Sequence, residues 1–327
     1  MPKSGAPVFI LGSPRSGTTL LYHMILSAGD FAIYRTESNV FNLLLPKFGD
    51  LRVRANRQRL LDFWLRSKLF TRSGLHEEEI KARILNSCQS GGDFLRIVMG
   101  EIARSQNVRR WAECTPEHLL YMLQIQEAIP EALIIHIIRD GRDVALSLAQ
   151  QNWIRPYPWQ KDQGVFVAGL FWEWMVRKGR ALGATIGHNY LEVRFEDLVK
   201  SPSETLSVLG RFIDHDLDYE RIRRVAIGSV EKPNTSFSSE CKAEPFEPIG
   251  RWRQGFSPDG LLRFEGLVGP FLEKLGYPLA TPPDKLDRSL ALRQMRALYR
   301  FHFQSKLWLR NKTPLGRILI RPDLSRF

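Results

Sequence analysis

Cysteine is scarce in this sequence. Only three of the 327 residues are cysteines, Cys88, Cys114 and Cys241, and no two of them form a Cys-x-x-Cys pair. This pattern gives no case for a disulfide scaffold or a zinc site. This usage is typical of a reducing compartment, and we expect a cytoplasmic protein.

Long apolar runs are also missing. No stretch of eighteen uncharged apolar residues occurs, which excludes a transmembrane helix. The first six residues, Met-Pro-Lys-Ser-Gly-Ala, contain no apolar segment of the kind found in a cleaved secretion signal. Hydrophobic residues nevertheless make up 43% of the chain, enough for a substantial buried core.

Acidic residues are few toward the C-terminus. Residues 284–327 hold eleven Lys or Arg against three Asp, which accounts for +8 of the net charge of +12. The basic character therefore belongs mainly to this tail. No recognised nucleic-acid recognition motif accompanies it, so we expect no nucleic-acid partner.

Three short apolar runs predict buried parallel strands, at residues 7–11, 132–138 and 190–195. Each run is followed by a helical pattern, an order typical of an α/β fold. Residues 50–110 are charged and helical in rhythm, which predicts a helical insertion. The loop at 153–159, rich in proline and tryptophan, is expected to border a cleft. We expect a domain over residues 1–283 and a basic helical extension over 284–327.

The first apolar run leads into the loop Gly12-Ser-Pro-Arg15-Ser16-Gly17-Thr18-Thr19. Its two glycines and its last threonine match the Walker A pattern GxxxxGK[ST], but Thr18 replaces the lysine and the cation is Arg15. Amide groups at a helix start, together with the helix dipole, form an anion site. The alternative is an ordinary turn between a strand and a helix.

A second motif follows the strand predicted at 132–138. It reads Arg139-Asp-Gly-Arg142-Asp143-Val-Ala-Leu-Ser147. The guanidinium of Arg139 at the strand end and the hydroxyl of Ser147 in the next helix are placed to bind one phosphate near the helix start. Taken alone, Arg139 and Asp140 also fit a surface ion pair. The two motifs together favour two separate anion sites.

The two motifs resemble those of sulfotransferases that use 3′-phosphoadenosine 5′-phosphosulfate (PAPS). The loop is similar to the PRSGTT version in tyrosylprotein sulfotransferases and related bacterial enzymes. The resemblance implies a P-loop NTPase-like sheet flanked by helices, of the sulfotransferase type. It also implies a 5′-phosphosulfate site formed by five consecutive residues, Arg15, Ser16, Gly17, Thr18 and Thr19.

By the same resemblance, Arg139 and Ser147 bind the 3′-phosphate that distinguishes PAPS from ATP. The segment Arg194-Phe195-Glu196-Asp197-Leu198 resembles the family's R-[YF]-E-D-L motif and implies that Phe195 lies near the adenine. Gly250-Arg251-Trp252-Arg253 resembles the closing region, where Arg251, with Arg253 as second choice, folds over the nucleotide. Because a sulfonate carries less charge than a polyphosphate, we expect no metal.

A general base must take the proton of the acceptor hydroxyl or amine. The resemblance places a catalytic glutamate shortly after the first helix, and Glu37 matches with a shift of one residue, while Arg15 stabilises charge on the leaving phosphate. Alternative bases are Glu113, His23 and His118. Cys114 stands where the family usually has lysine before Thr-Pro, and we interpret it as a small buried residue.

The acceptors that fit the sequence are a small molecule, a lipid, a glycan or a peptide. The tail from 286 to 309 mixes arginines with Leu, Phe, Tyr and Trp at helical spacing. Such a helix packs on its own domain or on a second copy in a homo-oligomer, or it contacts an anionic membrane peripherally. The other functions that fit the loop are a P-loop kinase and a non-catalytic nucleotide-binding protein.

Overall fold

The fold is built around a small parallel sheet. The structure, a computed structural model, describes residues 3–231, 247–287 and 289–319. Its four described strands lie in the order β2-β1-β3-β4, and all neighbours are parallel. The strands are β1 (Val8–Gly12), β2 (Ala112–Glu113), β3 (Leu133–Ile138) and β4 (Tyr190–Arg194). The three strands predicted from apolar runs are confirmed, and the two-residue β2 was not foreseen because it is too short to show a pattern.

Helices dominate the rest of the chain. The α-helices are α1 (Thr18–Ser27), α2 (Leu45–Phe48), α3 (Arg54–Leu65), α4 (Lys68–Ser73), α5 (Glu77–Ser87), α6 (Gly91–Ser105), α7 (Met122–Ala128), α8 (Gly141–Gln150), α9 (Gly164–Ile186), α10 (Phe195–Lys200), α11 (Pro202–Ile213), α12 (Tyr219–Val225), α13 (Trp252–Gly255), α14 (Pro258–Lys274), α15 (Leu290–Lys312) and α16 (Leu315–Leu319). Shorter 3₁₀ or π segments are η1 (Val40–Leu44), η2 (Pro116–Tyr121), η3 (Pro158–Gln163), η4 (Gly187–Asn189) and η5 (Gly228–Val230).

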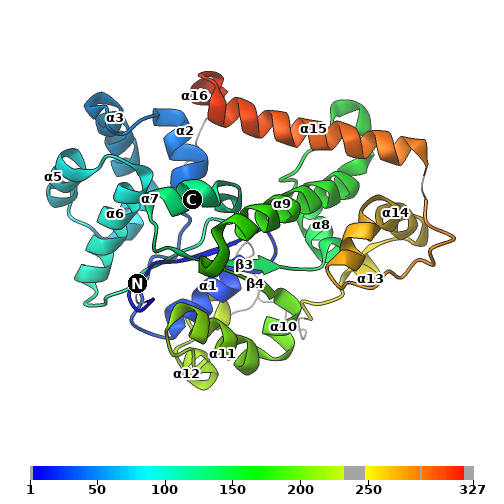
Figure 1. The fold of residues 1–327 in the computed structure, drawn as a ribbon, viewed down its shortest axis with the longest axis horizontal. Coiled ribbons are helices and arrows are strands. Elements are labelled where there is room, and N and C mark those ends of the chain that lie inside the picture. Colours follow the sequence, from blue (N-terminus) through cyan, green and yellow to red (C-terminus); the bar gives the residue numbers. More distant parts are fainter. Residues whose placement is uncertain (1–2, 232–246, 288, 320–327) are drawn as a thin grey trace.

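The alternation of side chains along the central strands divides the interior into two cores. On β3, Ile135 and Ile137 belong to one core, while Ile134 belongs to the other. Helices α1, α11 and α12 supply the first core, and α6, α8, α9 and α14 supply the second. Figure 1 shows α1 and α10–α12 on one side of the sheet and α9 on the other. Both faces are thus covered, as continuous apolar strands require.

The predicted helical insertion is present as α3 to α6, which form a lobe beside the sheet (Figure 1). The predicted tail helix is α15, which packs against α9 and α14. Its buried Tyr299 and Phe303 belong to the same core as α9, so the tail shares the interior of the preceding domain. The division of the chain at residue 283 stays a prediction. None of the described helices is both long and apolar enough to traverse a bilayer.

Candidate active site

The first anion loop connects β1 to α1. Gly17 precedes the helix with φ of 97°, a left-handed conformation that favours glycine. A Cβ atom on Gly17 would lie 2.3 Å from Cδ2 of Phe195, so the loop lies directly against that ring. At Gly12 a Cβ atom would lie 2.6 Å from the carbonyl oxygen of Ile137 on β3. Both glycines are therefore required by close approach, and they bring the amides of the loop to the start of α1.

The second motif lies at the end of β3 and the start of α8. The carboxylate of Asp140 caps α8 by accepting a hydrogen bond from the amide of Arg142 at 2.9 Å. The guanidinium of Arg139 lies 4.5 Å from the centre of the Phe195 ring. It also donates to the carbonyl oxygen of Arg15 at 3.1 Å. The motifs are therefore in direct contact although 124 positions separate these two arginines.

Arg15 completes the junction of the two motifs. Its Nε donates to Oγ of Ser147 at 2.8 Å, and its guanidinium lies 5.7 Å from the centre of the Trp153 ring. Trp153 belongs to the 153–159 loop that the sequence places at a cleft, and it does line one. The side chains predicted for the 5′ and 3′ sites thus form one continuous surface.

That surface encloses a cavity of about 390 Å³, within the size range of small-molecule sites. The predicted nucleotide-binding residues that line it are Arg15, Gly17, Thr18, Thr19, Arg139, Ser147, Phe195 and Arg251. Ser16 does not line the cavity; it is fully buried, and its Oγ has no hydrogen-bond partner among the described residues. Buried hydroxyls are rarely left unpaired, so a buried water is the expected partner of this oxygen.

Positive charge is concentrated at this cavity. Arg15, Arg139, Arg223 and Arg251 line it, and none of the described lining residues is an aspartate or glutamate. Burial lowers the pKa of Arg15, and the charges of Arg139 and Arg251 lower it further. Burial likewise lowers the pKa of Arg139 despite the opposing effect of Asp143. Gathering cations costs free energy that an anionic ligand relieves, so the cavity is built for a polyanion.

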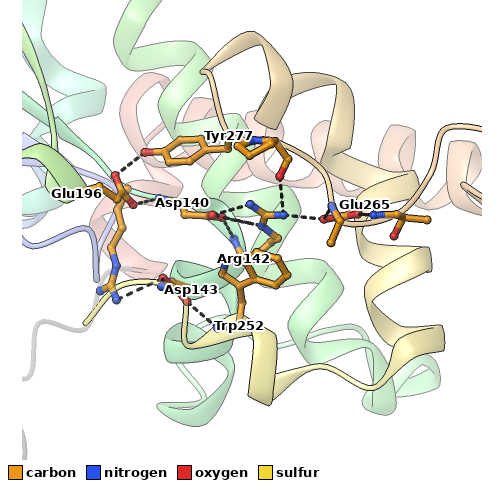
Figure 2. A network of polar contacts seen from close by, with 12 residues as sticks. Asp140, Arg142, Asp143, Glu196, Trp252, Glu265 and Tyr277 are labelled. Carbon is orange, nitrogen blue, oxygen red and sulfur yellow. Dashed lines mark hydrogen bonds and ion pairs between the residues drawn. The ribbon is translucent and has the colours of Figure 1, made fainter. Parts of the chain in front are cut away.

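A buried polar network holds the backbone on both sides of Arg251, and Figure 2 shows its members Asp143 and Trp252. The carboxylate of Asp143 accepts hydrogen bonds from the amides of Gly250 at 2.9 Å and Trp252 at 2.8 Å. It also lies 3.9 Å from the guanidinium of Arg139. One carboxylate on α8 therefore connects the second motif to the segment that carries Arg251.

Arg142 lies at the centre of the same network (Figure 2). It is 1% exposed, forms ion pairs of 2.7 Å with Asp140 and with Glu265, and stacks 3.7 Å from the centre of the Trp252 ring. Glu196 accepts hydrogen bonds of 2.9 Å from the amide of Asp140 and from the hydroxyl of Tyr277. The role of Arg142 in this network was not predicted from the sequence. The signal was the repeated Arg-Asp pair at a buried strand end.

Glu37, the predicted base, is not among the residues that line the cavity. Its negative charge adds to the burial that raises the pKa of the Cys114 thiol, and this thiol interacts with the side chain of Thr18 in the first loop. Burial raises the pKa of Glu37 to about 8, and the negative charges of Glu113 and Glu117 add to the increase. A carboxyl group with a pKa near neutrality is suited to proton transfer.

Glu113, the first alternative base, is fully engaged in hydrogen bonds. It accepts from the hydroxyl of Ser38 at 2.7 Å, from the amide and hydroxyl of Thr115, and from Nδ1 of His118 at 3.1 Å. Burial favours a higher pKa, but the interaction with His118 and the hydroxyls of Thr115 and Ser38 leave the pKa of Glu113 below its ordinary value. This carboxylate fixes the loop that follows Glu37, because it also accepts from the amide of Ser38.

The two histidines have structural partners. Nε2 of His118 accepts from the amide of Phe41 at 3.2 Å, which leaves the proton on Nδ1 facing Glu113. Nδ1 of His23 accepts from the amide of Ser229 at 3.0 Å and contacts its hydroxyl at 2.7 Å. Burial, aided by the charge of Arg35, lowers the pKa of His23 to about 4. His23 thereby holds η5, whose Ser229 lines the cavity, against α1.

The thiols of Cys88 and Cys114 are both buried, and Cys241 lies outside the described residues. Within the described ranges, no group of three or more His, Cys, Asp or Glu side chains is arranged to hold a metal ion.

A glycine-bearing loop between a buried parallel strand and a helix, joined in one cationic cavity to the end of the next strand, defines an anion-binding α/β protein of the P-loop type. The model of the sulfotransferase family matches residues 7–219, which is more than half of the chain. The chain therefore belongs to the sulfotransferase family, and it is a sulfotransferase.

Relatives extend this similarity over most of the chain. Protein-tyrosine sulfotransferase A of Caenorhabditis elegans is 24% identical over 85% of this chain and 69% of its own length. Protein-tyrosine sulfotransferase 1 of Danio rerio is 24% identical over 85% of this chain and 74% of its own length. The sulfotransferase domain of the Synechococcus PCC 7002 olefin synthase has a TM-score of 0.52 and 22% identity, and covers 77% of this chain and 89% of that domain. It supports the fold assignment.

Proposed function

We propose that the chain transfers a sulfonate group from PAPS to an acceptor hydroxyl or amine by in-line displacement. The observation that carries this proposal is the convergence of Arg15 and Arg139, from two separate motifs, on one cavity with four arginines and no described acidic lining residue. PAPS carries a 3′-phosphate and a 5′-phosphosulfate on the same ribose, and a single cavity lined by cations from two adjoining motifs suits both groups. When bound, PAPS supplies the sulfonate and leaves as PAP (3′-phosphoadenosine 5′-phosphate).

Each side chain then has a defined task. Thr18, Thr19 and the loop amides hold the 5′ end, and Arg15 stabilises the negative charge that develops on the leaving phosphate. Arg139, Ser147 and Arg251 hold the 3′-phosphate. Glu37 takes the proton of the acceptor, for which a raised pKa is favourable. The absence of a lysine at Thr18 disfavours an ATP-dependent kinase.

The acceptor is the open part of the proposal. Relatives named protein-tyrosine sulfotransferases make a tyrosine hydroxyl in a peptide the first acceptor to test. Small molecules, lipids and glycans are the other acceptor classes to assay. Transfer of labelled sulfonate from PAPS, assayed against each class without added metal, should identify the acceptor. Turnover with ATP and Mg²⁺ in place of PAPS would contradict the proposal.

The donor site is tested by thermal unfolding with PAP or AMP. PAP should raise the Tm far more than AMP does, because only PAP carries the 3′-phosphate. Arg139→Ala should remove most of this difference. Arg253→Ala is the matched control, since Arg253 stacks 4.6 Å from the centre of the Trp252 ring and does not line the cavity. Equal stabilisation of the wild-type protein by AMP and PAP would show that the 3′-phosphate site is wrong.

A further inference from the structure

Helix α15 has two apolar faces, of which only one is covered. On the inner face, Leu292, Met295, Tyr299 and Phe303 are buried in the core. The inner face is fixed by polar contacts as well, because the hydroxyl of Tyr299 donates to Oε1 of Gln160 at 2.8 Å. Figure 1 shows α15 lying along one edge of the molecule, above α9. The inner face accounts for the attachment of the helix to its own domain.

The outer face exposes large hydrophobic side chains. Leu290 is 69% exposed, Phe301 72% and Trp308 56%. About three helical turns separate Leu290 from Phe301, and about two turns separate Phe301 from Trp308. The three side chains therefore project from one side of the helix, opposite the buried residues. On α16, Leu315 and Ile318 are also exposed, at 48% and 71%. These side chains form an interrupted stripe along the helix, with Leu298 beside it at 37% exposed, and a stripe of Leu, Phe and Trp is typical of a helix that lies in a membrane interface.

The charge of the helix identifies the partner. Residues 290–312 contain six Lys or Arg and no Asp or Glu. The inward-facing Arg296 and Arg310 pair with Glu173 and Glu117 of the same domain. By contrast, Arg293 and Arg300 are exposed and border the apolar stripe on one side. A face with Phe and Trp in the middle and cations at the border matches the interface of an anionic bilayer.

We propose that the outer face of α15 and α16 docks on the surface of an anionic phospholipid bilayer. Phe301 and Trp308 enter the interfacial region while the neighbouring arginines contact lipid phosphates. A second copy of this chain fits less well, because a twofold interface would bring the same cations against each other without acidic partners. The docking is peripheral, and it does not depend on the sulfonate-transfer proposal.

The test is cosedimentation of the full chain with vesicles of phosphatidylcholine alone or with about one quarter phosphatidylserine. The wild-type protein should bind the anionic vesicles and bind the neutral ones much more weakly. Phe301→Ser with Trp308→Ser should lower the partition coefficient at least about tenfold, since two large side chains lose their contact with lipid. Arg293→Gln with Arg300→Gln should lower it about 25-fold, at about fivefold for each cation, and added salt should reduce wild-type binding.

Val208→Ser with Val225→Ser is the matched control, because both valines are exposed, at 46% and 52%, on α11 and α12 across the sheet. This control should bind anionic vesicles as the wild-type protein does. Far-UV circular dichroism and the Tm establish that each variant is folded. Equal binding by all variants, or wild-type protein that binds neither vesicle, overturns the proposal. The proposal is also overturned if the wild-type protein binds no vesicles but self-associates, and the Phe301 and Trp308 changes abolish that self-association. Binding to RNA in place of vesicles would overturn it as well.

Discussion

The protonation of Glu37 gives the sharpest prediction. Burial and the charges of Glu113 and Glu117 move its pKa from an ordinary 4.5 to about 8. Between these two values the folded protein binds a proton that the unfolded chain has already released. The free energy of unfolding should therefore fall as pH rises, by about 1.4 kcal/mol per pH unit. Over the whole window the loss of unfolding free energy is at most about 5 kcal/mol. This value is an upper bound because part of the Glu37 side chain contacts solvent, which weakens the effect.

Glu37→Gln removes this titration while keeping the shape of the side chain. Relative to wild type, the variant should gain stability steadily between pH 5 and 8, and the difference should be constant above pH 8. Urea unfolding at several pH values measures it. Glu79→Gln on α5, where the side chain is exposed, is the control and should show no such trend. A stability difference that is the same at pH 5 and pH 8 would refute the reasoning.

The same group should govern activity. Only the deprotonated carboxylate accepts a proton, so kcat/KM should rise about tenfold per pH unit below pH 8 and level off above it. Glu37→Gln should reduce kcat by about 10²-fold to 10⁴-fold while leaving the PAP-induced rise in Tm intact. A flat profile between pH 6 and 8 would assign the base to another residue.

Two further changes test the architecture of the site. Gly17→Ala should lower the stability by about 2–4 kcal/mol and abolish the PAP-induced rise in Tm, because a Cβ atom there meets the Phe195 ring at 2.3 Å and the φ is 97°. Gly29→Ala, at φ of 89° with open space, should show the cost of φ alone, and equal effects would contradict the steric argument. Arg142→Leu removes the ion-pair partner of the buried Asp140 and Glu265 and should cost about 3–5 kcal/mol in urea unfolding. An unchanged midpoint would show that the network is not stabilising.

The fold and the anion loop could be predicted because their signals are local. Apolar runs such as residues 132–138 define buried strands through the exclusion of water from both faces. In the first loop, Gly17 has a left-handed backbone conformation that other residues rarely adopt, and Gly12 allows the close approach of β3. The second motif was also visible locally, because Arg139 follows directly on a buried strand. An ionised group in that position needs a partner or a ligand.

Other features depend on contacts between distant segments. No local pattern shows that Asp143 holds the amides beside Arg251, that Glu113 fixes the loop after Glu37, or that His23 secures η5. The burial that raises the pKa of Glu37 is likewise a property of the packed chain.

The tail shows the same division. Its amphipathic and basic character was fixed by composition and spacing, because a helix projects every third or fourth residue to one side. Which of its two apolar faces is covered was decided only when α15 packed on α9, since burial depends on the neighbour and not on the helix. By itself the sequence determined three of the four described strands, the two motifs that follow buried strands and the family resemblance. Tertiary structure alone decided which charges meet, because electrostatic coupling depends on distances that only folding sets.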